Sequence, residues 1–181
     1  MRMNGYRRRE RGFTLIELMA VVIIVGILAV IAGVSYRRYI AASRTSEARY
    51  MVGSIRAAEE SYRAETLSYL DVSSSITNYY PATNPGAFKS AWDNPSHADY
   101  AKWKQLGVRS DGPVVYGYAV KAGLAGSVPP TLSINSPPAW PATTEPWYVI
   151  EAAGDVDGDG ARSYVVGSSF TGEIYVENEG E

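Results

Sequence analysis

The chain has 181 residues, of which 46% are apolar and 20% are charged, as is typical of one globular domain with an extension. It contains no cysteine, which excludes disulfides, zinc–thiolate sites and thiol catalysis. Residues 1–12 hold five arginines and one glutamate, a side-chain charge of +4. Because the whole chain carries −2, residues 13–181 carry −6 and offer no basic surface for nucleic acid.

A long apolar run, residues 13–34, follows the basic segment. As a helix it would be about 33 Å long, which matches the hydrocarbon core of a bilayer. The charge before the run is more positive than the charge after it, so we expect the N-terminus in the cytoplasm and residues 40–181 across the membrane. Glu17 interrupts the run near its start, and an ionisable side chain at membrane depth indicates a function.

Two kinds of processing fit the basic start. A secretory signal peptide cut after Val30-Ile31-Ala32 would have an unusually long apolar region and would give Glu17 no role. A cut between Gly12 and Phe13 would instead create an ammonium group on Phe13, one helical turn from Glu17. The two charges could pair within one helix or between neighbouring helices of a filament, where a lone buried charge is costly.

The segment Arg11-Gly12-Phe13-Thr14-Leu15-Ile16-Glu17-Leu18 resembles the class III signal of type IV pilins and pseudopilins. The resemblance extends over about residues 7–70. It implies that a prepilin peptidase cleaves after Gly12 and methylates Phe13, and that Glu17 guides the docking of subunits. Many members of the family have a proline where this chain has Val34, so Gly33 is here the candidate soft spot of the helix.

The resemblance also implies where the protein goes and what it meets. The precursor is expected in the inner membrane, where an assembly platform with a cytoplasmic ATPase would build it into an extracellular pilus. Its partners there are copies of itself and other pilins.

The helical pattern continues beyond the apolar run, because apolar residues recur at helical spacing. The predicted face consists of Ala41, Ala48, Val52, Ile55, Ala58 and Tyr62. Glu59 and Arg63 are predicted to lie off that face as an ion pair four residues apart. The helix is expected to end between Thr66 and Leu70.

The second half of the chain predicts an antiparallel sheet. Residues 71–113 read as an irregular connection with short helical turns around 95–106. Strand-like runs follow at 114–120, 147–152, 163–167 and 173–176. Six prolines between the first two runs predict an extended, exposed segment that is either a contact surface or an inert loop.

We therefore expect an α+β fold in which a long N-terminal helix, hydrophobic in its first half, packs on a small antiparallel sheet. The predicted parts are a leader (1–12), a transmembrane and filament-core helix (13–34), an amphipathic continuation (35–70) and a globular head (71–181).

Asp155-Val156-Asp157-Gly158-Asp159-Gly160 matches the first six positions of an EF-hand-type calcium loop. The candidate ligands are Asp155, Asp157 and Asp159. The twelfth position is Val166 rather than glutamate, so Glu151 or Glu173 would have to supply the missing ligand. The alternative is an Asp/Gly turn with exposed carboxylates. The resemblance bears on the choice, because many pilins close this region with a disulfide and some relatives use calcium.

The sequence does not predict an enzyme. His97 is the single histidine, and its neighbours Ser96 and Asp99 on a loop do not make a triad, so we expect a solvated side chain. The leading prediction is a structural subunit of a type IV pilus for surface motility, adhesion or DNA uptake. The alternatives are a type II secretion pseudopilin, which would be periplasmic, and a membrane-anchored binding protein that does not polymerise.

Overall fold

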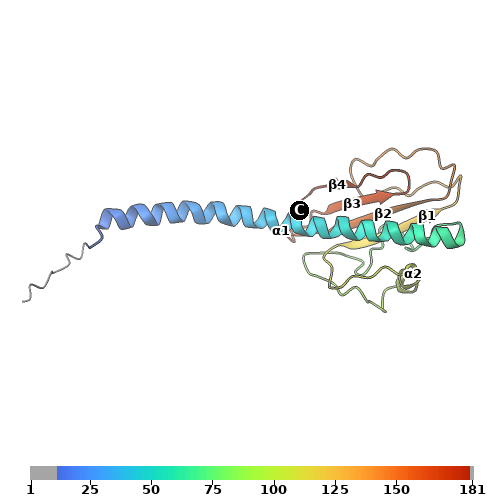
Figure 1. Cartoon of the computed structure of the whole chain (residues 1–181), viewed down its shortest axis with the longest axis horizontal. Helices are drawn as coiled ribbons and strands as arrows, with labels where there is room; N and C mark the ends of the chain where they lie inside the picture. The colour runs from blue at the N-terminus through green and yellow to red at the C-terminus, as the bar shows by residue number, and fades with distance from the viewer. Residues whose placement is uncertain (1–11, 180–181) are drawn as a thin grey trace, which may run out of the picture. The chain divides into compact units, whose positions relative to one another are not determined.

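The computed structural model describes residues 12–179, so the predicted leader lies outside the described residues except for Gly12. The chain divides into two compact units between Arg38 and Tyr39. One helix, α1 (Leu15–Thr66, 52 residues), begins in the first unit and ends in the second (Figure 1). It continues without a break through Gly33, the predicted soft spot.

Within the first unit, residues 15–34 are helical and apolar on all sides. The side chains of residues 15–34 are exposed around the whole circumference of α1, including fourteen large hydrophobic ones. By length and composition α1 can cross a membrane. A helix that is hydrophobic all round requires an apolar environment, either lipid or other protein.

The second part of α1 is amphipathic, as predicted. Ala48, Val52 and Ile55 are fully buried against the sheet, and the helix ends at Thr66, at the start of the expected range. The predicted pair between Glu59 and Arg63 is wrong. The chain reverses after Thr66 and covers the helix end, so that Glu59 is fully buried and accepts a hydrogen bond from the Leu70 backbone N–H (2.9 Å).

Arg63 points elsewhere. Its guanidinium donates to the Tyr69 hydroxyl (2.8 Å) and to the Glu145 carboxylate (3.1 Å). Its carboxylate partner therefore comes from a distant loop and not from the preceding helical turn.

The sheet has four antiparallel strands in the order β1-β2-β3-β4, which confirms the predicted α+β fold. The strands are β1 (Gly117–Gly123), β2 (Trp147–Gly154), β3 (Ser163–Ser168) and β4 (Tyr175–Glu177). The first strand begins three residues later than predicted, because Val114 forms an isolated bridge with Ser90 instead of pairing with β2. The fourth strand is shorter and shifted, and it pairs only over Tyr175–Glu177.

Two hydrophobic clusters cover the two faces of the sheet. Alternate strand residues such as Tyr118, Ile150 and Val165 pack with α1, and their neighbours such as Val149 and Val166 pack on the opposite side. Because both faces are covered, β2 is buried along its whole length. The helix approaches the sheet closely at Gly167 in β3, where an added Cβ would lie 2.7 Å from Val52 Cγ1.

The proline-rich segment covers the face of the sheet opposite α1. The prediction of an extended and exposed segment is therefore only half right, because its Leu132 and Ile134 are buried in the second cluster. Glu151 of β2 faces the same side and is fully buried. It accepts hydrogen bonds from the Tyr79 hydroxyl (2.6 Å) and the Ser133 backbone N–H (2.8 Å), which fasten the segment to the sheet.

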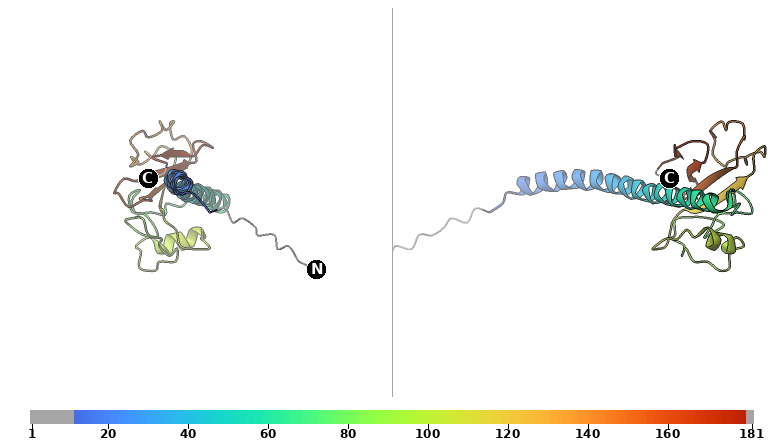
Figure 2. Two further views of the ribbon diagram at one scale, coloured as in Figure 1. Left: turned by 90° about the vertical axis from the view of Figure 1, so that its left-hand side faces the viewer. Right: turned by 45° about the vertical axis from the view of Figure 1, so that its right-hand side comes forward.

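The connection between α1 and β1 lies beyond the β1 edge of the sheet, on the side away from β4 (Figures 1 and 2). It contains one short helix, α2 (Tyr100–Leu106), within the range predicted to form helical turns. Gly107 ends α2 with a backbone φ of 78°, which glycine adopts without strain. An isolated bridge between Tyr80 and Tyr118 ties this connection to β1.

Candidate functional site

The predicted processing and assembly residues lie at the start of α1. Gly12 and Phe13 precede the helix in irregular backbone, and the Phe13 side chain is 82% exposed. Glu17 lies in the first helical turn. Its carboxylate accepts hydrogen bonds from the Thr14 backbone N–H (2.9 Å) and the Thr14 hydroxyl (2.7 Å).

Thr14 and Glu17 together form a capping box. The Thr14 hydroxyl accepts from the Glu17 backbone N–H (3.3 Å), while Glu17 reaches back to the Thr14 backbone N–H, so two otherwise unpaired donors are satisfied. The pattern of threonine followed three residues later by glutamate is the sequence signature of this motif. The sequence interpretation overlooked it and assigned Glu17 to assembly alone.

The cap brings the Glu17 carboxylate close to the predicted cleavage junction. In the unprocessed chain the Phe13 nitrogen is a peptide nitrogen, so Glu17 has no ammonium partner there. The Glu17 carboxylate already accepts a hydrogen bond from the backbone N–H of Thr14, the residue that follows Phe13. The predicted charge pair stays a prediction, and the structure adds a second role for Glu17 that any test must separate from it.

The three predicted calcium ligands do come together. Carboxylate oxygens of Asp155, Asp157 and Asp159 lie within 4.8 Å of one another. Asp155 accepts from the backbone N–H groups of Gly158 (2.7 Å) and Gly160 (3.2 Å), which holds the loop in a tight turn. Calcium takes six to eight oxygen ligands, so three carboxylates supply part of such a site.

Neither predicted supplementary ligand joins this cluster within the described residues. Glu151 is occupied on the buried face of the sheet by Tyr79 and Ser133, as described above. The cluster is also consistent with the alternative of an Asp/Gly turn, because backbone N–H groups already use oxygens of all three aspartates. Calcium binding therefore stays a prediction.

The loop that carries the aspartates is anchored to α1. Val156 is buried in the core, and its carbonyl accepts a hydrogen bond from the Arg44 guanidinium (2.5 Å). Further along α1, Arg56 donates to the carbonyls of Thr171 and Gly172 (3.0 Å each). Two arginines of α1 thus hold two C-terminal turns of a chain that has no disulfide.

The predicted solvent exposure of His97 is wrong. The ring is buried, its Nε2 donates to the Tyr79 carbonyl (2.9 Å), and its Nδ1 accepts from the Asp99 backbone N–H (3.1 Å). The Asp99 carboxylate instead accepts from Ser74 and Asn78, not from the histidine. Both ring nitrogens are therefore occupied by backbone groups, and His97 has a structural role in this arrangement.

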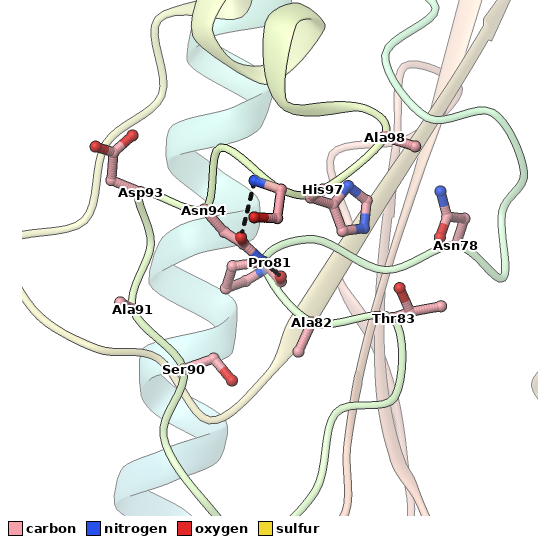
Figure 3. A pocket seen from close by; sticks show the side chains of 11 residues that line it. Asn78, Pro81, Ala82, Thr83, Ser90, Ala91, Asp93, Asn94, His97 and Ala98 are labelled. Atoms are coloured by element: carbon pink, nitrogen blue, oxygen red, sulfur yellow. Dashed lines mark hydrogen bonds between the residues drawn. The ribbon is translucent and has the colours of Figure 1, made fainter.

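His97 borders a polar hollow of about 440 Å³ (Figure 3). Its rim is held by Asn94, whose amide donates to the Pro81 carbonyl (2.8 Å) and whose carbonyl oxygen accepts from the Ser96 backbone N–H (3.2 Å). The polar groups of Asn94, His97 and Asp99 that face this region hydrogen-bond to backbone groups or to Ser74 and Asn78.

Comparisons with known proteins find similarity in the N-terminal segment of the chain. A family described as the prokaryotic N-terminal methylation motif matches residues 7–33. The type IV major pilin protein PilA of Myxococcus xanthus (strain DK1622) is 42% identical over 76 residues, which are 42% of this chain and 34% of that protein. The type IV major fimbrial protein FimA of Dichelobacter nodosus is 53% identical over 51 residues, 28% of this chain and 33% of that protein.

A fimbrial protein of Pseudomonas aeruginosa is 46% identical over 54 residues, 30% of this chain and 35% of that protein. The chain thus spans about a third of the length of these curated relatives. No solved structure gives a significant match. The N-terminal segment of this chain therefore carries the prokaryotic N-terminal methylation motif and is similar to the corresponding segment of type IV pilins and fimbrial proteins.

Proposed function

We propose that this chain is a prepilin, the structural subunit of a type IV pilus. In this proposal a prepilin peptidase cuts between Gly12 and Phe13 and methylates the new Phe13 amine. The mature chain waits in the inner membrane, and a platform driven by a cytoplasmic ATPase then assembles it with copies of itself into an extracellular filament. The filament serves surface motility, adhesion or DNA uptake.

The observation that carries the proposal is the methylation motif at residues 7–33, together with the helix that begins inside it at Leu15 and exposes apolar side chains on all sides over residues 15–34. Such a helix is stable in lipid before assembly and in a filament core afterwards, because both surround it with apolar groups. The relatives that share the segment are named as pilins and fimbrial proteins, which favours a pilus over a secretion pseudopilus.

The charge pair explains how a filament could set its register. In the bilayer Glu17 is tolerated because it lies near the helix end, close to water and headgroups. In a filament core the Phe13 ammonium needs an anion, and the Glu17 carboxylate of an adjacent subunit supplies it. Removal of either charge leaves the other one buried without a partner, which costs about 3–5 kcal/mol.

Three variants separate this role from the cap at Thr14. Glu17→Gln keeps the acceptor that the cap requires and removes the charge. Thr14→Ala removes the hydroxyl of the cap, at a cost of about 1 kcal/mol in helix stability, and keeps the charge. Glu17→Leu removes both the charge and the acceptor of the cap, and it makes the segment more apolar. N-terminal sequencing and intact mass of the membrane fraction establish processing, and electron microscopy counts surface filaments.

We expect all three variants to insert in the membrane and to be cut at Phe13. Glu17→Gln and Glu17→Leu should give few or no filaments, whereas Thr14→Ala should assemble nearly as well as the unsubstituted chain. The charge-pair mechanism is refuted if Glu17→Gln is processed and still builds normal numbers of filaments. A mature N-terminus at Gly33 would refute the prepilin itself and indicate a secretory signal peptide.

A further inference from the structure

The head contains a second cavity, of about 470 Å³, between the segment around residues 91–93, helix α2 and the loop 107–113. Four aromatic side chains line it: Tyr80, Trp92, Tyr100 and Trp103. It shares Ala91 and Asp93 with the polar hollow beside His97, so the two hollows adjoin along one segment. Neither the prepilin motif nor the proposed assembly uses this part of the molecule.

The aromatic wall is fixed by its own packing. The Tyr80 and Trp103 rings stack with centroids 5.2 Å apart, and the Trp92 ring meets Trp103 edge-on at 5.6 Å. Trp92 Nε1 donates to the Val108 carbonyl (3.0 Å), and the Tyr80 hydroxyl donates to the Trp92 carbonyl. Tyr80 and Trp103 are buried and support the wall from inside, so a ligand would meet the partly exposed rings of Trp92 and Tyr100. These rings are already held in place and would not have to be ordered, which favours binding.

The rim of the cavity is more positive than the rest of the head. Lys104 and Arg109 line it and form no ion pair within residues 12–179. Lys104 Nζ lies 5.6 Å from the centre of the Tyr100 ring. The third charged residue of the rim, Asp93, leaves a local side-chain charge of +1 in a chain whose residues 13–181 carry −6.

We propose that this cavity binds an acidic sugar, a pyranose ring that carries a carboxylate, presented by a polysaccharide or glycan. The C–H face of a pyranose is apolar and packs on aromatic rings, while its hydroxyls need the mixed donors and acceptors of the rim. Arg109 pairs with the sugar carboxylate through its planar fork of donors. Single-stranded nucleic acid uses similar rings but needs a groove of cations along its backbone, which two cations in an acidic head do not provide.

The test uses the full-length chain, unassembled, in an amine-oxide detergent without a sugar headgroup. Isothermal titration compares trigalacturonate with the neutral maltotriose and with a ten-residue oligothymidylate. We expect trigalacturonate to bind, more weakly as salt rises, and to bind at least tenfold more tightly than either of the others. Arg109→Gln should weaken its binding about tenfold or more, because a hydrogen bond between two charged groups is lost.

Two further variants make the result specific. Tyr100→Leu removes a ring of the wall and should weaken trigalacturonate and maltotriose alike, while Lys89→Gln removes a cation outside the cavity and should change neither. Unchanged melting curves show that the variants are folded. The proposal is overturned if trigalacturonate does not bind at 10 mM, if Arg109→Gln and Lys89→Gln act equally, or if oligothymidylate binds more tightly. Because binding is measured on unassembled protein, these outcomes are independent of whether filaments form.

Discussion

Replacement of Glu59 by glutamine is expected to stabilise the second compact unit above neutral pH and to leave it unchanged or up to about 1 kcal/mol less stable at pH 5. Glu59 is fully buried at the end of α1, where one carboxylate oxygen accepts from the Leu70 N–H and the other, Oε1, has no partner. Burial raises the pKa of Glu59 from 4.5 to about 7, the Leu70 hydrogen bond opposes the rise, and the charges of Glu60 and Asp71 add to it.

The sign follows from proton binding. Between pH 4.5 and 7 the folded head holds a proton on Glu59 that the unfolded chain releases, so the free energy of unfolding falls as pH rises through this window. Above pH 7 the buried charge is fully formed. A pKa that moves from 4.5 to about 7 corresponds to about 3 kcal/mol. Glutamine at this position carries no charge and so avoids this loss of stability. One of its side-chain N–H groups would be buried without an acceptor, however, at a cost of about 1–2 kcal/mol.

The net gain of Glu59→Gln at pH 8 is therefore about 1–2 kcal/mol, or roughly 3–7 °C in the melting temperature of a domain of this size. The assay is thermal unfolding, followed by near-ultraviolet circular dichroism between pH 5 and pH 8, of a fragment beginning at Tyr39, where the second compact unit starts. Glu65→Gln, an exposed change on the same helix, is the control and should leave the curves unchanged. A difference between Glu59→Gln and the unsubstituted head that is the same at pH 5 and pH 8 would contradict a buried, titrating carboxylate.

Three other changes test the core and the aspartate loop by thermal unfolding of the same fragment. Gly167→Ala should destabilise it by about 1–3 kcal/mol, since the new methyl group meets Val52; an unchanged melting temperature would disprove the close helix–sheet contact. Tyr79→Phe should cost about 1.5–3 kcal/mol at pH 7, because Glu151 loses a buried hydrogen bond, and a neutral effect would mean that water replaces the hydroxyl. If the loop binds calcium, free calcium at 100 times the dissociation constant should add about 2.7 kcal/mol, and Asp157→Asn should reduce that gain; equal curves with calcium and with chelator would leave only a turn.

The extent of what could be predicted differs along the chain. The sequence predicts the methylation motif, the apolar run and the buried face of α1. Each depends on residues that are close in sequence, and the buried face of α1 also repeats with the helical period. The capping box at Thr14 and Glu17 is equally local and was within reach of the sequence. The four strands were found for the same reason, although the edges of β1 and β4 were misplaced.

Tertiary structure decided the features that depend on which distant segments meet. The burial of Glu59 follows from the chain reversal after Thr66, and the burial of Glu151 follows from the proline-rich segment that covers its face of the sheet. Local pattern places a charged residue in water by default, because a carboxylate is buried only where a partner arrives from elsewhere in the chain. The same holds for the aromatic cavity, whose Trp92 and Trp103 come from a loop and a seven-residue helix that show no shared pattern in the sequence. The sequence by itself determined the helix and its signal, whereas only packing decided where charges and rings are enclosed in the head.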